Sequence, residues 1–335
     1  MEQITIGTSG LTTSRVGLGT WAIGGWMWGG TDEAQSIATI RSAVERGVTL
    51  IDTAPAYGFG RSEEIVGKAL AEGSLRDKVQ IATKVGLTWH DGTVYRDSRP
   101  ARIRKEIEDS LRRLQTDVID LYQVHWPDVQ TPIAETARAL EDLRREGKIR
   151  AIGVSNHSPA QMNTFRAVAR LDAVQPPYNI FEREIEADVL PYAKRTGLTV
   201  LSYGALCRGL LSGRMSIQTK FQGDDLRKVD PKFQGDRFRQ YLSAVRELEK
   251  LARERFGKSI LALAVRWVLD QGPTIALWGA RKPSQLDPVG EIEGWHIDAA
   301  TKDEIDVILK RCIADPVSPS FMAPPLARQR ELSAA

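Results

Sequence analysis

Short apolar runs alternate with longer amphipathic segments along most of the chain. The short runs have the length of strands and the longer segments repeat their apolar positions at helical spacing, a pattern typical of strands joined by crossover helices. Eight such units in a chain of 335 residues favour an α/β fold, the closed (β/α)8 TIM barrel, over an open doubly wound sheet. The predicted strands are residues 16–18, 50–52, 79–84, 119–124, 151–154, 173–175, 198–202 and 274–277.

Local signals mark several boundaries of these elements. Ser158, followed by Pro159 and Gln161, predicts a capped helix start. A small β-hairpin is expected between residues 2 and 15, before the first barrel strand, and an extra helix over 298–312 near the C-terminus. No linker separates two cores, so we expect one domain over residues 1–335.

Two segments interrupt the alternation of strands and helices. Residues 212–236 are polar and contain several glycines. They predict a long loop, which either closes over a site or forms a mobile surface excursion. Residues 315–325 contain four prolines and no periodicity, so this tail is expected to wrap around the domain or fray.

Composition narrows the class of partner. Hydrophobic residues make up 42% and charged residues 27% of the chain, as in an ordinary folded protein. Lys and Arg number 46 against 43 Asp and Glu, a balance that favours a small-molecule partner over nucleic acid or a membrane surface. The two cysteines and an N-terminus without signal-peptide features indicate a cytoplasmic protein. The oligomeric state is not predicted.

Polar side chains follow six of the predicted strands. In a barrel the carboxyl ends of all strands meet at one rim, where active sites lie. Taken singly, each residue has a structural interpretation, such as a helix cap, a solvated lysine or a core imidazole. Six of them at corresponding positions favour a site, and they are Asp52, Lys84, His125, Ser155 with Asn156, Gln175 and Tyr203.

Tyr57, five residues after Asp52 in a loop shaped by Pro55 and glycines, completes a chemical unit. A phenol is a poor acid near neutral pH unless a nearby cation favours its anion, and Lys84 is the candidate cation. A buried lysine needs a carboxylate, which Asp52 can supply. His125 could donate a hydrogen bond to a substrate carbonyl oxygen. No metal-ligand spacing is present.

These residues lie in motifs that resemble the aldo-keto reductases. The resemblance extends from about residue 17 to residue 285. The matching motifs are the segment from Asp52 to Glu63, which contains Tyr57; Lys84; the His125-Trp126-Pro127-Asp128 run; Gly153 to Asn156; Gln175; and Gly279-Ala280-Arg281. Within the superfamily, residues 203–213 are similar to the bacterial branch that includes general stress and inositol-utilisation reductases.

The resemblance implies reversible, NADPH-dependent reduction of aldehydes or ketones to alcohols, without a Rossmann domain. Tyr57 would be the general acid, tuned by Lys84 and Asp52, and His125 would orient the carbonyl. Arg281 and Lys282 would meet a 2′-phosphate and favour NADP, with NAD a weaker alternative. Val289 stands where many members have asparagine. The implied cofactor-binding residues are Gly19, Thr20, Trp21, Asp52, Ser155, Asn156, Gln175, Tyr203, Gly204, Leu206, Arg208, Leu210, Gly279, Ala280, Arg281, Lys282 and Gln285.

Aromatic residues near the strand ends suggest an apolar substrate pocket. Its candidate residues are Trp21, Trp26, Trp28, Trp89 and Trp126. Alternative functions are a sugar or alcohol dehydrogenase that works mainly in the oxidative direction, or a cofactor-binding regulatory subunit. A third alternative is an aldolase-like barrel in which Lys84 forms a Schiff base.

Overall fold

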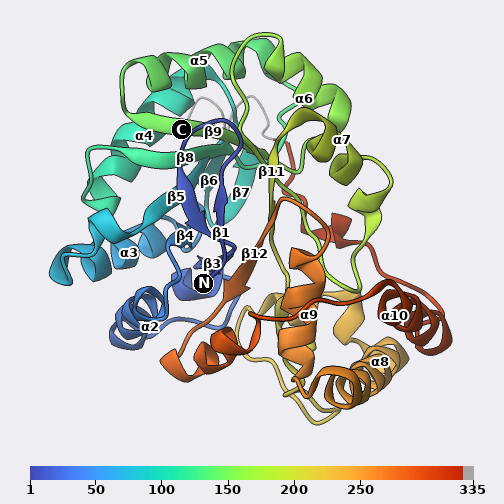
Figure 1. Cartoon of the computed structure of the whole chain (residues 1–335). Coiled ribbons are helices and arrows are strands. Elements are labelled where there is room, and N and C mark those ends of the chain that lie inside the picture. Colours follow the sequence, from blue (N-terminus) through green and yellow to red (C-terminus); the bar gives the residue numbers. More distant parts are fainter. Residues whose placement is uncertain (327–335) are drawn as a thin grey trace.

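The computed structural model describes residues 1–326 and shows a closed barrel of parallel strands surrounded by helices (Figure 1). The predicted (β/α)8 TIM barrel is confirmed. Around the barrel the strands are β3 (Val16–Gly19), β4 (Leu50–Asp52), β5 (Gln80–Val85), β8 (Ile119–Val124), β9 (Ile149–Ser155), β10 (Ala173–Gln175), β11 (Thr199–Ser202) and β12 (Thr274–Gly279), which pairs with β3 to close the ring.

Alternation along the strands fills the barrel interior with apolar side chains. Because successive side chains of a strand point to opposite faces, one residue in two faces inward. Ile6, which precedes the barrel, is fully buried in the same cluster, so the N-terminal segment closes the amino end of the barrel. The strand residues of this cluster are Leu50, Ala82, Leu121, Ala151, Ala173, Leu201, Ile275 and Leu277.

The predicted N-terminal hairpin is present as β1 (Gln3–Thr5) and β2 (Thr12–Ser14), which pair antiparallel. It lies across the barrel end that faces the viewer in Figure 1. The covering helices are α2 (Glu33–Glu45), α3 (Arg61–Glu72), α4 (Pro100–Leu114), α5 (Ile133–Arg145), α6 (Pro159–Arg166), α7 (Val189–Thr196) and α9 (Ile260–Leu269). Ser158 and Gln161 form the predicted capping box at the start of α6.

Additional elements lie outside the eight strand-and-helix units of the barrel. A hairpin that the sequence analysis did not predict, β6 (Leu87–His90) with β7 (Thr93–Arg96), follows β5. A short helix, α1 (Trp21–Gly24), follows β3. The long helix α8 (Gly235–Phe256) packs against α9 and against the predicted extra helix, α10 (Ala299–Cys312). Within residues 1–326, no helix is both long and apolar enough to cross a bilayer.

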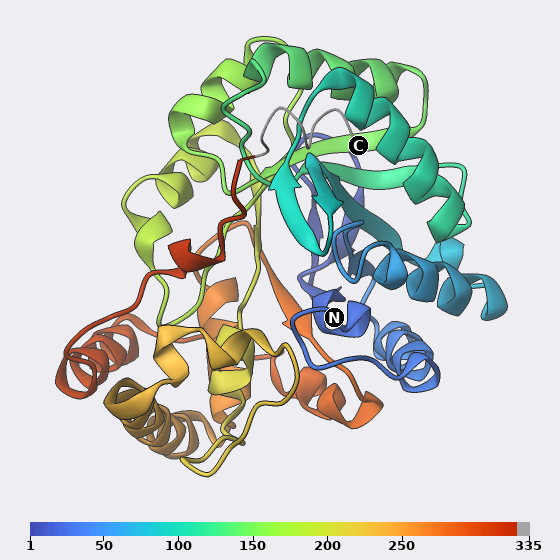
Figure 2. The same ribbon diagram turned by 180° about the vertical axis from the view of Figure 1, so that it is seen from behind.

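The C-terminal segment returns to the β6–β7 hairpin. Figure 2 shows this red segment passing from α10 to the cyan hairpin. Arg96 joins the two, because its Nε donates to the Pro324 carbonyl at 2.9 Å and its backbone N–H donates to the Pro325 carbonyl at 3.2 Å. The proline-rich tail therefore wraps over the carboxyl end of the barrel, at least as far as residue 326.

Candidate active site

A buried ion pair lies just above the apolar interior of the barrel. Lys84 Nζ donates to Asp52 Oδ2 at 2.8 Å and to the Thr53 carbonyl at 2.9 Å, and both charged side chains are almost completely buried. Strands β4 and β5 are neighbours, so the inward-facing positions at their carboxyl ends meet. A buried ammonium needs such partners because burial without them is costly.

Tyr57 lies directly over this pair. Lys84 Nζ is 4.9 Å from the centroid of the phenol ring, Trp21 stacks on the ring at 5.9 Å, and His125 meets it edge-on at 5.7 Å. The loop reaches this position through a close backbone approach. A Cβ on Gly24 would lie 2.5 Å from the Tyr57 carbonyl oxygen, so this contact requires glycine.

Charge and burial set the protonation states of these groups. Burial, and then the Asp52 carboxylate, raise the pKa of Tyr57 well above its ordinary value of 10.0. Burial lowers the pKa of Lys84, although Asp52 favours its charged form. Burial, and then the Lys84 ammonium, hold the pKa of His125 well below 6.5. The net shift is opposite in direction to the acidic phenol that the sequence predicted, because burial and Asp52 both favour the neutral phenol. The catalytic roles of Tyr57 and Lys84 stay predictions.

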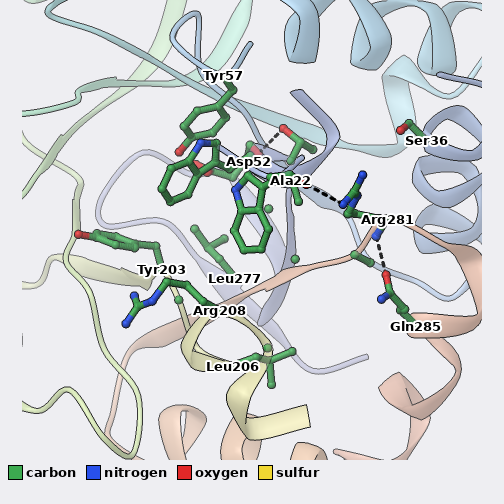
Figure 3. Close-up of a pocket in the computed structure, with 18 of the residues that line it drawn as sticks. Ala22, Ser36, Asp52, Tyr57, Tyr203, Leu206, Arg208, Leu277, Arg281 and Gln285 are labelled. Carbon is green, nitrogen blue, oxygen red and sulfur yellow. Dashed lines mark hydrogen bonds between the residues drawn. The ribbon is translucent and has the colours of Figure 1, made fainter. Parts of the chain in front are cut away.

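Two cavities meet at Tyr57 and Trp21. The first, of about 480 Å³, extends along the barrel rim to Arg281 and Gln285. Figure 3 shows Tyr57 and Asp52 at one end of it, Arg281 and Gln285 at the other, and Tyr203, Arg208 and Leu206 along one side. The second, of about 400 Å³, opens above His125 and the end of β9. Tyr57 is thus accessible from an elongated cleft and from a separate, mostly apolar chamber.

Most of the predicted cofactor residues line one of the two cavities. The first cavity is lined by Gly19, Thr20, Trp21, Asp52, Tyr203, Gly204, Leu206, Arg208, Gly279, Ala280, Arg281, Lys282 and Gln285. Ser155, Asn156 and Gln175 line the second. Leu210 lines neither and is fully buried. Val289 is likewise packed in the core, 2% exposed, so it faces neither cavity.

The predicted nicotinamide-binding residues are already bonded to each other and to the ion pair. The Tyr203 hydroxyl donates to Asn156 Oδ1 at 3.0 Å, and Ser155 Oγ donates to the Gln175 carbonyl at 2.7 Å. Gln175 Nε2 donates to Asp52 Oδ1 at 2.8 Å. One connected polar layer therefore joins the ion pair to the floor of the second cavity.

The far end of the first cavity is cationic. Arg281 Nη1 donates to the Trp28 carbonyl at 3.0 Å, and Gln285 Oε1 accepts from the Arg281 backbone N–H at 2.7 Å. In the part of the chain that the structure describes, neither Arg281 nor Lys282 has a carboxylate within ion-pair distance. Their charges are thus available to an anion.

The Arg208 guanidinium belongs to a buried charge cluster beside the cleft. It contacts Glu182, and its Nε lies 2.6 Å from Asp230 Oδ2. Lys232 Nζ lies 2.9 Å from Glu182 Oε1, and all four side chains are buried. The Asp230 and Lys232 pairs are close in distance but lack hydrogen-bond alignment. The expected contact of Arg208 with phosphate therefore competes with two carboxylates that already hold its side chain.

Residues 212–236 fold over the cleft onto the loop that follows α1. Asp224 accepts from the backbone N–H groups of Met27 and Gly29 at 2.7 and 3.0 Å. Arg227, which lines the first cavity, places its guanidinium 5.0 Å from the Trp28 ring centroid. Of the two interpretations of this segment, the structure supports the loop that covers a site. We call residues 212–236 the covering loop.

The second cavity has walls that the sequence analysis only partly identified. Trp21, Trp26 and Trp126 line it, whereas Trp28 lines the first cavity. Trp89 lines neither and packs on Phe59. No local signal identified the remaining walls, because long-range folding brings them there. They include Leu226 and Val229 of the covering loop, Val94 of the β6–β7 hairpin, and residues 321–325 of the tail.

Comparisons with known proteins agree on one family. The model of the aldo/keto reductase family matches residues 15–310. The aldo-keto reductase YhdN of Bacillus subtilis is 61% identical over 326 residues, which cover 97% of this chain and 98% of that protein. The NADH-specific methylglyoxal reductase of Escherichia coli is 38% identical over 302 residues, covering 85% and 91%.

Solved structures give the same picture. The glycerol dehydrogenase AKR11B4 from Gluconobacter oxydans superposes with a TM-score of 0.87 at 58% identity, covering 96% of this chain and 99% of that one. An aldo/keto reductase from Klebsiella pneumoniae in complex with NADP and acetate superposes with a TM-score of 0.72 at 26% identity, covering 99% of both chains. The resemblance inferred from the motifs is therefore confirmed.

The hydrogen bonds from Met27 and Gly29 to Asp224 should limit how often the covering loop opens. Asp224→Ala removes the acceptor for two backbone N–H groups, so trypsin should cleave between residues 212 and 236 about fivefold faster or more, given about 1 kcal/mol for each hydrogen bond. Gln218→Ala is the matched control because Gln218 is an exposed residue of the same segment. Equal cleavage of Asp224→Ala and the wild type would show that Asp224 does not hold the loop.

Proposed function

Since the chain belongs to the aldo/keto reductase family, we propose that it is an NADP-dependent oxidoreductase that reversibly reduces an aldehyde or ketone. The observation that carries this proposal is the position of Tyr57 over the Asp52–Lys84 pair, where the elongated cleft and the apolar chamber meet. We also propose that the chain forms a single domain over residues 1–335 and that it is cytoplasmic, as expected from the sequence.

The cleft has the chemistry that an extended nicotinamide dinucleotide requires. Its inner end lies beside amide and hydroxyl groups that suit a carboxamide, and its outer end presents Arg281 and Lys282. Among the described residues, the buried indole nitrogens of Trp21 and Trp28 have no hydrogen-bond partner. Both rings line the cleft, and unpaired buried donors of this kind favour a polar ligand.

The chain's own residues would then divide the work of carbonyl reduction. A bound reduced nicotinamide would supply the hydride. Tyr57, protonated at neutral pH because its pKa is raised, would donate the proton to the carbonyl oxygen. His125, neutral because its pKa is lowered, would donate a hydrogen bond to the same oxygen. The Lys84 ammonium would stabilise the phenolate that the proton transfer leaves.

The Schiff-base alternative fits this arrangement less well. Lys84 Nζ already donates to Asp52 and to the Thr53 carbonyl, and the side chain is fully buried beneath Tyr57. A lysine nucleophile needs an uncharged amine that the substrate can reach. Because all four expected catalytic side chains face one site, a purely regulatory cofactor-binding role is also less well supported.

The direction of the reaction and the substrate class rest on different observations. A relative at 58% identity is called a glycerol dehydrogenase and another at 38% a methylglyoxal reductase. We therefore propose small oxygenated carbonyls or alcohols as substrates. The glycerol dehydrogenase favours the oxidative alternative, whereas the raised pKa of Tyr57 keeps the phenol in the protonated form that reduction uses.

Preference for NADP over NAD rests on two cations at the outer end of the cleft that form no ion pair among the described residues, although Arg281 donates to the carbonyls of Trp28 and Gly30. Arg281 and Lys282 line the cleft, and a guanidinium is well suited to a phosphate group. The relative named NADH-specific shows that the family can use either coenzyme, so this preference needs its own test.

Removing the phenol oxygen tests the proposed acid. Tyr57→Phe should lower kcat for carbonyl reduction by about 10²-fold to 10⁴-fold, because only the proton donor is lost. The dissociation constant of NADPH, measured by fluorescence titration, should change by less than about twofold. Tyr95→Phe, at a tyrosine that lines neither cavity, should behave as the wild type. Full turnover by Tyr57→Phe would overturn the assignment.

Removing one cation tests the coenzyme preference. Arg281→Ala should weaken NADPH binding about tenfold to a hundredfold, the range of a charge-assisted contact, and NADH binding by less than about threefold. Arg253→Ala is the control because this arginine is 70% exposed on α8. An equal effect on both coenzymes would refute the 2′-phosphate contact.

A further inference from the structure

A buried glutamine outside the expected set of site residues lies in the same layer as the ion pair. Gln123 stands two residues before His125 on β8, where alternation points it into the barrel, as it does Leu121. In register it lies opposite Lys84 on one side and Gly153 on the other. Its side chain is fully buried and lines neither cavity, so it would not touch substrate.

Gln123 contacts the same oxygen of Asp52 as Gln175 does. Its Nε2 donates to Asp52 Oδ1 at 3.4 Å, and its Oε1 accepts from Gln175 Nε2 at 3.3 Å. Gln175 Nε2 also donates to Asp52 Oδ1, at 2.8 Å. The two amides thus occupy one carboxylate oxygen and leave the other, Oδ2, to Lys84.

The neighbouring strand leaves room for this side chain. A Cβ on Gly153 would lie 2.8 Å from Gln123 Cγ, closer than side-chain carbons approach without displacement. The absence of a side chain at position 153 lets an amide stand in the polar layer, above the apolar layer that includes Leu121 and Ala151. A buried amide is costly unless it is hydrogen-bonded, and here its oxygen and nitrogen both have partners.

We propose that Gln123 is a positioning residue for the proton donor. Together with Gln175 it fixes the rotation of the Asp52 carboxylate, so that Oδ2 holds Lys84 beneath Tyr57. This inference rests on the proposed function, because it assigns Gln123 to the reaction in which Tyr57 gives the proton. An apolar side chain of similar size would fill the same space but would leave Asp52 Oδ1 with one amide donor, that of Gln175. Gln175 would also lose the contact with Gln123 Oε1 that orients its amide.

Gln123→Met tests the amide while keeping the volume. We expect kcat for carbonyl reduction to fall about tenfold, the value of one hydrogen bond to a charged group, whereas KM and the dissociation constant of NADPH stay within about twofold. Tyr122→Phe is the matched control, since Tyr122 is a buried neighbour on the same strand and its hydroxyl has no partner among the described residues. An unchanged kcat in Gln123→Met would overturn the inference.

The pH dependence of kcat in Gln123→Glu is a second test, because a substitution at a purely structural residue would not change it. A carboxyl buried beside Asp52 has its pKa raised above the ordinary glutamate range. While protonated, it still donates to Asp52, so kcat should be near the wild-type value at low pH. As pH rises through the raised pKa, the second carboxylate competes for Lys84, and kcat should fall in this variant alone. A pH profile parallel to that of the wild type would overturn the inference, even if Gln123→Met does not fold.

Tyr57→Phe, measured alongside, separates the two proposals. If Tyr57→Phe is inactive and both Gln123 variants match the wild type, only the role of Gln123 is wrong. If Tyr57→Phe is fully active, Tyr57 is not the proton donor and the role of Gln123 is wrong with it, whereas a wild type that reduces no carbonyl with either coenzyme would refute the proposed function itself. Loss of kcat in Gln123→Met, with the altered pH profile of Gln123→Glu and an inactive Tyr57→Phe, is the result that supports both.

Discussion

The contact between the Lys84 ammonium and the Asp52 carboxylate, buried beneath Tyr57, is the constraint on which the rest of the site depends. Neither charge could stay ionised so far from water without the other, and loss of either partner would leave an unpaired buried charge. The apolar interior of the barrel lies directly below the pair and excludes water from it. Strand register holds Asp52 and Lys84 side by side, because they are on adjacent strands, and the close backbone approach at Gly24 holds the Tyr57 loop over them.

The two cavities obtain their shape from segments that are distant in sequence. The covering loop is joined to the loop after α1 through Asp224, and the tail is joined to the β6–β7 hairpin through Arg96. The covering loop contributes walls to both cavities, with Arg227 in the cleft and Leu226 and Val229 in the chamber, and the tail adds residues 321–325 to the chamber. A rigid barrel therefore holds the reacting groups, and more adaptable segments determine which molecules reach them.

Much of the site could be predicted because parallel strands bring their carboxyl ends to one rim. That rule alone grouped Asp52, Lys84 and His125, and the barrel itself followed from the repeated strand and helix pattern. Gln123 was missed although alternation along β8 places it inward, because only residues at the very ends of strands were considered. The β6–β7 hairpin was missed although Asp91 and Gly92 form a typical hairpin turn, with φ of 47° and 75°.

The positions of the covering loop and the tail depend on long-range contacts that no local pattern records. The direction of the pKa shift of Tyr57 depends on burial, which strand-end chemistry does not reveal.

In the proposed reaction, the proton comes from a neutral phenol and not from a protonated imidazole. The most direct measurement is the pH dependence of kcat for carbonyl reduction at saturating coenzyme and substrate. Because the pKa of Tyr57 is raised and that of His125 is lowered, the phenol stays protonated and the imidazole neutral through neutral pH. We expect kcat to be level across this range and to decline only under alkaline conditions. A rate that falls as pH rises through about 6.5, the ordinary pKa of histidine, would contradict it.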